Sequence, residues 1–193
     1  MVILVLVRTG DKYSEWYENN IIHMVKDNLN YDDVFVIREG EGSVFDKLKM
    51  FKFCTDDVNY LYFDLDIIIK GSIEHLVKDN FTILHAWWRP ALHTPLNSSI
   101  MSWKGDHSRI FTKFYEDEDY SRVKYWKGID EYIYKEIEYD TYNKVCWSWP
   151  WNRNVLTYPV CLFNHGTTNE MVHFNKYLLG GRGGEIDSQL PNT

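Results

Sequence analysis

The stretch NYLYFDLDIIIKGSI, residues 59 to 73, combines a strongly hydrophobic pattern with two acidic side chains in its middle. Residues 58 to 63 read as a buried strand, and Asp64 and Asp66 follow it closely. Burying an unpaired carboxylate is so costly that such groups are normally paired or hold a metal ion. The pattern therefore predicts a buried strand that ends at Asp64, where both carboxylates meet a cation.

The spacing of the two aspartates favours a metal site over a simple turn. On extended backbone, residues i and i+2 point to the same face, so Asp64 and Asp66 are predicted to lie side by side. Ligands of open α/β sheets bind at the carboxyl ends of the strands, and hard oxygen ligands suit Mg²⁺ or Mn²⁺. An ion held there could neutralise a departing diphosphate. The alternative is a turn in solvent, in which the two aspartates cap backbone amides.

The residues before this stretch alternate strands with helices. Strands are predicted at residues 2 to 7 and 33 to 37, and Ser43 followed by Asp46 is a capping-box pattern that opens a helix. A helix between the two strands would turn inward Tyr13, Trp16, Tyr17, Ile21, Met24 and Val25. This β-α-β-α-β order predicts the α/β class, with a mainly parallel central sheet flanked by helices.

The second half of the chain is less regular. It favours strands at 81 to 86 and 98 to 103, helices around 110 to 115 and 129 to 137, and a last strand in YPVCLFNHG. The aromatic segment VCWSWPWNRNV reads as irregular, and the Gly-rich end, about 180 to 193, reads as a flexible tail. With no repeat and no linker, residues 1 to 193 are predicted to form a single domain.

Composition excludes several classes of protein. The formal net charge of −7 argues against a protein that binds nucleic acid through its backbone charge. Cys54, Cys146 and Cys161 form no C-x-x-C motif, so neither a zinc ribbon nor a disulfide framework is indicated, and a reducing compartment is expected. The apolar start MVILVLV is too short for a signal peptide or a membrane span. We therefore expect a soluble, cytoplasmic protein, located in the host cytoplasm if it is viral.

The segment LYFDLDIIIKGSI resembles the hallmark of the nucleotide-sugar-dependent glycosyltransferases of the GT-A fold, in which an apolar strand ends in D-x-D and continues to a Gly. The chain is most similar to the small, glycogenin-like members and their viral relatives. The resemblance runs from residue 2 to about residue 175 and rests on several short motifs in the same order. It implies the GT-A fold and transfer of a sugar from a nucleotide donor.

The resemblance also implies a donor-binding set. It places Thr9 and Tyr13 of VRTGDKY near the nucleoside base and Lys47 of FDKLKMF near the nucleotide, with Lys49 as a weaker choice. The small polar residues of LNSSIMSW would meet the sugar. The full implied set is Thr9, Tyr13, Lys47, Asp64, Leu65, Ser98, Ser99 and Gly166. The competing interpretations are a helix-core Tyr13, a solvated Lys49 and serines that form a turn before a strand.

GIDEYIY, residues 128 to 134, resembles the segment that brings a carboxylate or amide beside the reacting carbon of the sugar. The family often has Asp-Gln here, so it stays open whether Asp130 or Glu131 reaches the site; Asn97 is a third catalytic candidate. An inverting enzyme would use a carboxylate as base, and a retaining one would need a group on the opposite face of the sugar. The resemblance favours retention. Alternatively, Asp130 only caps the following helix.

LFNHGTTNE resembles the late strand and His-Gly of the family, which implies that His165 joins Asp64 and Asp66 as a ligand of Mn²⁺ or Mg²⁺. Gly166 would let the backbone approach the phosphates, whereas a surface histidine is the alternative for His165. Relatives carry a Lys three or four residues later to grip the diphosphate. This chain departs from that pattern: it has Thr168 and Asn169 there, and the possible substitutes are Arg153, Lys176 and Arg182.

These observations predict a metal-dependent glycosyltransferase that moves a hexose from a nucleoside diphosphate sugar, UDP-linked, to a glycan hydroxyl. Tryptophans could form the acceptor subsite or pack in the core: Trp87, Trp88, Trp147, Trp149 and Trp151. One alternative is a sugar-nucleotide pyrophosphorylase, but such enzymes begin with a Gly-rich loop and VLVRTGDKY has a single Gly. Another is an inert carbohydrate-binding domain that needs neither metal nor nucleotide.

Overall fold

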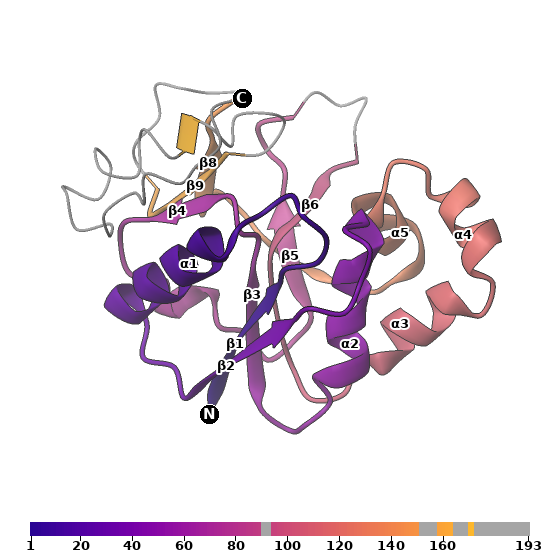
Figure 1. Cartoon of the computed structure of the whole chain (residues 1–193), viewed down its shortest axis with the longest axis horizontal. Coiled ribbons are helices and arrows are strands. Elements are labelled where there is room, and N and C mark those ends of the chain that lie inside the picture. The colour runs from indigo at the N-terminus through magenta and orange to yellow at the C-terminus, as the bar shows by residue number, and fades with distance from the viewer. Residues whose placement is uncertain (90–93, 151–157, 164–169, 172–193) are drawn as a thin grey trace.

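The structure is a computed structural model and describes residues 1–89, 94–150, 158–163 and 170–171. Within these ranges, helices flank a central sheet and a smaller sheet lies at one side (Figure 1). In chain order the elements are β1 (Val2–Val7), α1 (Glu15–Asn28), β2 (Asp33–Ile37), the 3-10 helix η1 (Val44–Leu48), α2 (Lys49–Phe53), β3 (Asn59–Phe63), β4 (Ile67–Ile69), η2 (Glu74–Leu76), β5 (Thr82–His85), β6 (Leu96–Lys104), α3 (Ser108–Tyr115), α4 (Glu118–Lys124), α5 (Ile129–Glu136), β7 (Asp140–Tyr142), β8 (Cys146–Ser148) and β9 (Val160–Leu162).

The central sheet has six strands in the order β2-β1-β3-β6-β5-β7. β1 pairs in parallel with both β2 and β3, and β5 pairs in parallel with β7, whereas β6 runs antiparallel to both of its neighbours. The prediction of an α/β protein with a mainly parallel sheet is therefore confirmed, and β6 is the one strand of this sheet that runs the other way. Its reversal brings its first residues to the same edge of the sheet as the carboxyl end of β3.

The pairing between β5 and β6 is interrupted at this edge. Ile83 is opposite Met101, but the next residue, Leu84, is opposite Asn97, so the register passes over three residues of β6. Such an irregularity leaves backbone groups of the longer strand without a ladder partner on that side. Two of the three skipped residues are Ser98 and Ser99, which the sequence identifies as donor-binding candidates.

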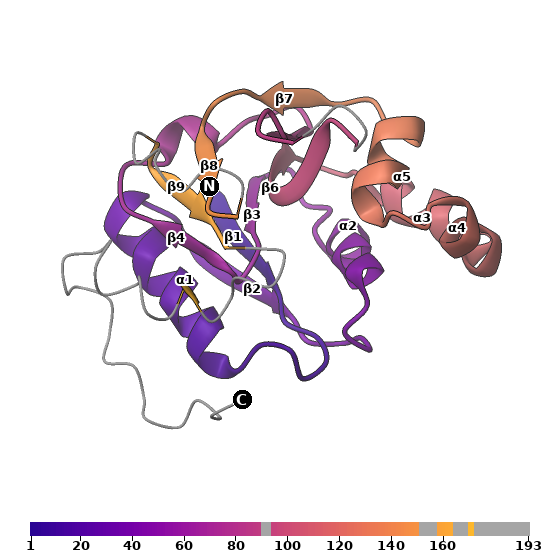
Figure 2. The same cartoon turned by 90° about the horizontal axis from the view of Figure 1, so that it is seen from above.

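Buried side chains alternate between the two faces of the central sheet, which explains the unbroken hydrophobic runs of β1 and β3. Leu4 and Leu61 pack in a cluster under α1, whereas Val5 and Tyr60 pack in a second cluster under α2, α3 and α5. Strands covered on both faces have no polar side to show in their sequence. Figure 2 shows α1 on one side of the sheet and α2, α3 and α5 on the other.

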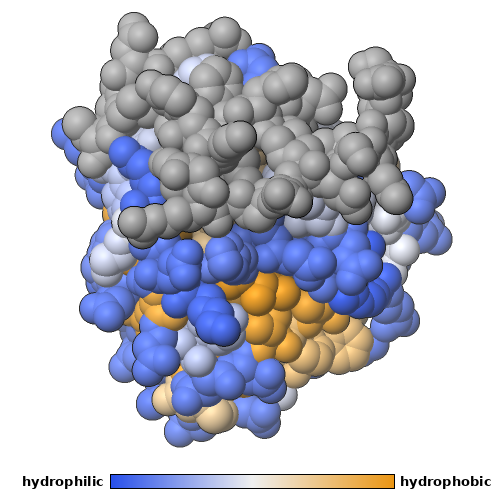
Figure 3. Space-filling view, turned by 60° about the vertical axis from the view of Figure 1, so that its left-hand side comes forward, coloured by the Kyte–Doolittle hydropathy of each residue, from blue (hydrophilic) through white to orange (hydrophobic). Residues whose placement is uncertain are grey.

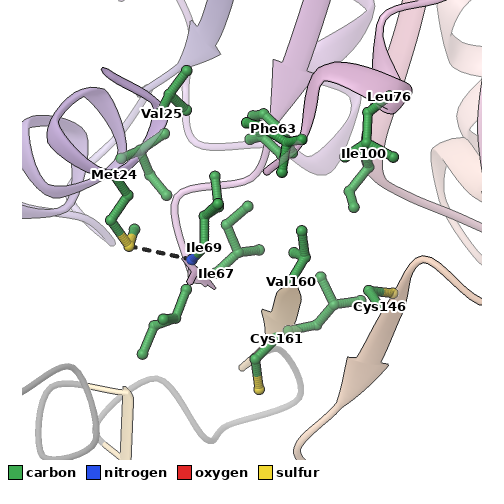
Figure 4. Close-up of a cluster of buried hydrophobic side chains, with 14 of the residues drawn as sticks. Met24, Val25, Phe63, Ile67, Ile69, Leu76, Ile100, Cys146, Val160 and Cys161 are labelled. Atoms are coloured by element: carbon green, nitrogen blue, oxygen red, sulfur yellow. Dashed lines mark hydrogen bonds between the residues drawn. The ribbon is translucent and has the colours of Figure 1, made fainter. Parts of the chain in front are cut away.

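A second sheet, β4-β9-β8, extends the cluster under α1. β4 pairs antiparallel with β9, and β9 pairs in parallel with β8. Figure 4 shows how Met24 of α1, Ile67 of β4 and Cys146 and Val160 of the other two strands point toward one another. The stretch after Asp66 is therefore not a continuation of β3 but the first strand of another sheet, which the sequence does not predict.

The central sheet has one long hydrophobic edge. β2 forms that edge, and its Phe35 is 40% exposed and lies against Phe53 of α2, which is 41% exposed. Figure 3 shows hydrophobic surface gathered in one area of the molecule, with hydrophilic residues around it. The opposite edge strand, β7, has three residues, of which the first two are exposed.

Most of the predicted elements are present within a few residues of their expected bounds, including the predicted capping box, in which Ser43 and Asp46 bond each other's backbone. The sequence misses α4, β4, β7 and β8, and the predicted irregularity of VCWSWPWNRNV is wrong for Cys146–Ser148. The predicted flexible tail lies outside the described residues. No helix in the described part of the chain is long and apolar enough to cross a membrane.

Candidate functional site

Asp64 and Asp66 lie at the junction of the two sheets. Asp64 directly follows β3, and its backbone amide donates to the carbonyl oxygen of Ser99 on β6 (2.9 Å). Asp66 directly precedes β4, and its carbonyl oxygen accepts from the amide of Phe163 (2.9 Å). The chain bends between the two aspartates, so the expected extended backbone is wrong at this point, because β3 and β4 belong to different sheets.

Asp64 is held by three side chains. Tyr62 donates its hydroxyl to Oδ1 (2.5 Å), Ser99 donates its hydroxyl to Oδ2 (2.8 Å), and the Nζ atom of Lys47 lies 2.5 Å from Oδ1. The side chains of Lys47 and Asp64 are 19% and 15% exposed, so the ion pair lies at the rim of the core. Lys47 also reaches the hydroxyl of Ser98 at 3.4 Å.

Asp66 is more deeply buried and has fewer polar neighbours. It is 4% exposed, and Tyr13 donates its hydroxyl to Oδ2 (2.7 Å). Burial, and after it the charge of Asp64, raise the pKa of Asp66, although the hydrogen bond from Tyr13 and the charges of Lys12 and Lys47 act against the rise. Burial beside the two carboxylates also raises the pKa of Tyr13, so its hydroxyl stays protonated and remains a donor.

Only one of the two carboxylates in this cluster has an ion-pair partner. Asp64 pairs with Lys47, whereas Asp66 has no ion pair within 4 Å among the described residues and receives only the longer-range charges of Lys12 and Lys47. A buried carboxylate beside another one is stabilised by a cation, and carboxylate oxygens suit Mg²⁺ and Mn²⁺. Asp64 and Asp66 therefore fit a divalent ion, although the described residues contain no group of three His, Cys, Asp or Glu side chains that could hold a metal.

The turn after β1 is fixed by a buried acid. Thr9 donates its hydroxyl to Oδ2 of Asp46 (2.9 Å), and the same oxygen accepts the amides of Gly42 (2.9 Å) and Ser43 (3.0 Å). The turn and the loop touch so closely that a Cβ on Gly10 would lie 2.8 Å from the Cα of Gly42. The hydroxyl of Thr9 is thus used within the fold, and only its backbone is free to face a nucleoside.

Two other donor-binding candidates do not contribute side chains to the cluster. Leu65 is 2% exposed and packs in the hydrophobic cluster under α1. Lys49, the weaker choice, donates to the carbonyl oxygen of Glu39 (2.9 Å) and lies 3.4 Å from Asp46. Both therefore serve the fold. Tyr13 lies before α1 and not inside it, so the alternative of a helix-core residue is wrong.

The polar residues of β6 face the aspartates from within the strand. Asn97, Ser98 and Ser99 are 4%, 4% and 2% exposed, and all three belong to β6, so the alternative of a turn before a strand is wrong. The Oδ1 atom of Asn97 accepts the amide of Ser99 (3.0 Å), which holds this side chain along the strand. The two serines lie next to Lys47 and Asp64.

The two acids of α5 have different surroundings. Asp130 accepts the amide of Ser98 at Oδ1 (2.9 Å) and Nη1 of Arg89 at Oδ2 (3.1 Å), so it joins β6 and not the amides of its own helix. Glu131 instead accepts the amide of Lys127 (3.1 Å) and Nζ of Lys135 (2.7 Å). Of the two predicted catalytic acids, Asp130 therefore lies beside the polar strand and Glu131 stabilises the start of α5.

The tryptophans divide between core and rim. Trp147 is 0% exposed and packs in the cluster under α1. Trp149 stacks on Phe163, and Trp87 donates its Nε1 hydrogen to the carbonyl oxygen of Cys146 (3.1 Å). Trp87 and Trp88 are half-buried at the end of β5. Among the described members of this set, Trp87, Trp88 and Trp149 keep partly exposed surface that a sugar ring could reach.

Several predicted residues lie outside the described ranges: Trp151, Arg153, His165, Gly166, Thr168, Asn169, Lys176 and Arg182. The structure nevertheless locates the strand before His165. Because Phe163 donates its amide to the carbonyl oxygen of Asp66, the chain leaves β9 directly beside the D-x-D segment. This is where the resemblance requires the strand that leads to the histidine.

Four residues that touch the cluster or its supports are absent from the sequence-based set: Tyr62, Arg89, Asp46 as a loop anchor, and Lys12. Tyr62 could have been found, because it precedes Asp64 by two residues on the same strand and shares its face. Arg89 could not, since its contact with Asp130 joins residues 41 apart. Lys12 lies over the ring of Tyr13 at 4.5 Å and adds positive charge near Asp66.

The geometry agrees with comparisons to solved structures. A glycosyltransferase involved in glycosylation of the major capsid of PBCV-1 matches with a TM-score of 0.67 and 12% identity, covering 92% of this chain and 98% of that one. The galactosyltransferase LgtC in complex with donor and acceptor sugar analogues matches with a TM-score of 0.61 and 11% identity, covering 96% and 98%. An active-site glutamine-to-glutamate variant of LgtC matches with 0.59 and 9%, covering 89% and 95%.

A scan against protein-family models gives no match, and a search of curated proteins gives none either. At 9 to 12% identity the structural likeness establishes the fold and not the activity. It extends over nearly the whole length of the chain and of each matched structure, as the sequence resemblance predicts. The chain has the GT-A fold of these glycosyltransferases.

Proposed function

We propose that this chain is a glycosyltransferase that moves a hexose from a UDP-sugar to a glycan hydroxyl, with retention of configuration, as a single domain. The observation that carries the proposal is the buried pair Asp64–Asp66 at the carboxyl end of β3, where Asp64 pairs with Lys47 and the more deeply buried Asp66 has no ion pair among the described residues. That edge of an α/β sheet is where nucleotides bind, and a cation would stabilise the unpaired carboxylate there.

Asp64 and Asp66 would hold Mn²⁺ or Mg²⁺, with His165 as a third ligand. When bound, such an ion neutralises the charge of a diphosphate. Tyr13 supports this role because its hydroxyl orients the carboxylate of Asp66, and Ser99 does the same for Asp64. Residues that orient a metal ligand in this way influence affinity for the metal.

The donor would lie across the turn after β1 and the start of β6. We expect the nucleoside to contact the backbone near Thr9 and the ring of Tyr13. The phosphates and the sugar would contact Lys47, Ser98 and Ser99. Lys47 already lies among a carboxylate and a serine hydroxyl, so a donor phosphate would compete with Asp64 for its charge.

In the reaction, the bond between the anomeric carbon and the diphosphate oxygen breaks, the acceptor oxygen bonds to that carbon, and the acceptor proton passes to the departing diphosphate. Asp130 would stabilise the positive charge that develops on the sugar; its contacts with Arg89 and the amide of Ser98, which hold its carboxylate against β6, support this role. Asn97 would face the sugar from the same strand, whereas Glu131 is held by Lys127 and Lys135. Trp87 and Trp88 could line the acceptor subsite.

The test is calorimetric titration of UDP with and without Mn²⁺ on the native chain and on Asp66→Asn. The matched control is Asp57→Asn, which changes an aspartate whose side chain is 90% exposed. We expect metal-dependent binding by the native chain and the control, and loss of that binding by Asp66→Asn. Failure of UDP to bind under any of these conditions would contradict the proposal.

Binding of UDP that ignores both the metal and the Asp66 substitution would leave a nucleotide-binding protein and remove the D-x-D assignment alone. A panel of nucleotide sugars scored for hydrolysis then identifies the hexose, and the anomeric form of the product decides between retention and inversion. Binding of free glycans without nucleotide would favour the inert carbohydrate-binding alternative.

A further inference from the structure

Among the described residues, no strand pairs with the outer edge of the edge strand β2. It is the outermost strand of the central sheet beside β1, and Phe35 at its centre is 40% exposed. Proteins usually shorten or charge the edges of their sheets, because an open edge pairs with other strands. The opposite edge follows that rule: β7 has three residues and begins with the exposed Asp140. β2 has five, with a hydrophobic centre.

The backbone of β2 offers its hydrogen-bonding groups outward at two positions. The carbonyl oxygen of Ile37 accepts the amide of Arg8 (2.9 Å), so the backbone hydrogen-bonding groups of Ile37 point toward β1. Successive residues of a strand point these backbone groups to opposite sides. The N–H and C=O groups of Val34 and Val36 therefore point away from β1, toward the open side of the strand. The amide of Val34 donates to the exposed carboxylate of Asp33 (2.8 Å), a contact that solvent can replace.

The sequence DDVFVIR, residues 32 to 38, is complementary to itself in the antiparallel direction. When two copies are centred on Phe35, Val34 of one copy lies opposite Val36 of the other, so the outward-facing residues meet as hydrogen-bonded pairs. Phe35 then lies opposite Phe35 of the second copy in the closer, non-hydrogen-bonded type of pair, where aromatic side chains stabilise the sheet.

The ends of this register carry opposite charges. Asp32 of one copy lies opposite Arg38 of the other, and the two-fold symmetry repeats the pair at the other end. Asp32 is exposed, and its Oδ2 atom accepts the amide of Val2 (2.6 Å). Both Nη atoms of Arg38 bond the carboxylate of Glu18 (2.6 Å each), and its side chain is 51% exposed, so Asp32 of the second copy would approach the outer side of this ion pair.

We propose that two copies of this chain form a dimer by antiparallel pairing of β2 with β2 around a two-fold axis at Phe35. The pairing joins the two central sheets into one continuous sheet and covers the hydrophobic surface made by Phe35 and Phe53. A closed two-fold contact of this kind uses the same surface of both copies and cannot extend into fibres. The proposal stands apart from the proposed enzymatic activity, because β1 separates β2 from β3, the strand that Asp64 and Asp66 follow.

The first experiment is sedimentation velocity of the full chain across a wide range of concentrations, where a dimer gains population by mass action. We expect a species of twice the chain mass of 23.1 kDa to grow with concentration. A monomer at every concentration overturns the proposal. This holds even if the amides of β2 are protected from hydrogen exchange, because another segment or molecule would then cover the edge.

The second experiment uses the two-fold axis itself. Residue 35 meets its own copy, so Phe35→Lys and Phe35→Glu should each be monomeric, because like charges directly opposite one another destabilise a sheet. An equimolar mixture of the two variants should form the dimer again, since opposite charges then meet. The matched control is Val123→Lys, which replaces a 77% exposed hydrophobic residue on α4 and should leave the dimer unchanged.

Each result bears on the proposal. Dimers of either single variant, or a mixture that stays monomeric, would overturn the antiparallel register even if the native chain dimerises. Circular dichroism of each variant establishes that it is folded, and exposure of Phe35 makes that outcome expected. Titration of UDP on the Phe35→Lys chain should match the native chain, which separates failure of this proposal from failure of the enzymatic one.

Discussion

Two carboxylate clusters in this protein have opposite charge balances. At the junction of the sheets, Lys47 pairs with Asp64 but not with Asp66, and burial beside Asp64 raises the pKa of Asp66. At the end of α5, a single acid, Glu136, meets Lys113 (2.8 Å) and Lys124 (3.0 Å).

Tyr125 also donates its hydroxyl to Glu136 (2.5 Å). The hydrogen bond from Lys113 has the largest effect on the pKa of Glu136, and together with those from Tyr125 and Lys124 it lowers this pKa to about 2. A carboxylate with surplus donors stabilises the folded chain, whereas buried carboxylates with too few cations cost stability and are retained where a ligand supplies the missing charge. By this contrast the Glu136 cluster stabilises the fold, and the Asp64–Asp66 cluster has the charge pattern that the proposed function requires.

The largest expected effect separates function from stability at Asp66. Asp66→Asn should lower UDP-sugar hydrolysis by roughly 100-fold or more, in the range seen when one electrostatic contact to a reacting group is lost. Without metal, its free energy of unfolding should stay the same or rise by about 1 kcal/mol, because repulsion from Asp64 disappears. Urea titration measures the second quantity. A marked loss of stability would mean that Asp66 is structural and would break the comparison.

Glu136 should show the opposite behaviour. Glu136→Gln removes the charge that Lys113 and Lys124 share, and should lower the free energy of unfolding by about 1 to 2 kcal/mol, a figure reduced for solvent screening of a side chain that is 20% exposed. UDP binding should not change. The control is Glu138→Gln, an exposed acid in the same segment, for which thermal unfolding should match the native chain. Equal effects of the two substitutions would contradict the structural role.

The native chain and Glu136→Gln should also differ in the pH dependence of their stability. The folded-state pKa of Glu136 lies below its ordinary value of 4.5, so its stabilising contribution is complete above that value and is lost as the pH falls toward about 2. The stability difference between the native chain and Glu136→Gln should therefore be constant near neutral pH and vanish across this acidic window. Urea midpoints measured through the window test it. A difference that persists at the acidic end would exclude the linkage.

The smallest expected effects come from the two tyrosines that donate to the aspartates. Tyr13→Phe should weaken metal-dependent UDP binding by roughly 10-fold, the lower end of what one hydrogen bond to a charged group contributes, because Tyr13 is the donor that orients Asp66. Tyr62→Phe should cost less, since Lys47 and Ser99 still hold Asp64. Calorimetry of both variants ranks them. The reverse order would show that Asp64 is the more sensitive ligand.

The sequence predicts the fold better than it predicts the site. Hydrophobic periodicity locates β1, α1 and β2 because each buries a continuous or alternating apolar face. Hydrophobic periodicity cannot show that Ile67–Ile69 belongs to a second sheet, because a buried apolar strand has the same sequence pattern in either sheet. Short strands such as β7 also carry too few residues to show a period.

Within the site, local spacing predicts the aspartates but not their neighbours. The D-x-D pattern reveals Asp64 and Asp66 because two acids interrupt a hydrophobic run. Contacts between distant segments, such as Arg89 with Asp130, depend on tertiary packing and leave no signal in one sequence. The same limit explains Thr9, whose hydroxyl is taken by Asp46, 37 residues away. Glu131 differs, because its partner Lys135 is four residues away and their helical spacing is visible in the sequence.

The interrupted pairing between β5 and β6 makes part of the site independent of side-chain identity. Because the register skips Ser98, its backbone amide is available to Asp130 and anchors α5 against the sheet. That anchor would survive a change of the side chain at this position, for example Ser98→Ala or Ser98→Thr. The backbone of residue 98 thus holds the helix, while its side chain is left free to vary. Under the proposed function, a change of side chain at position 98 would alter sugar preference without loosening the scaffold.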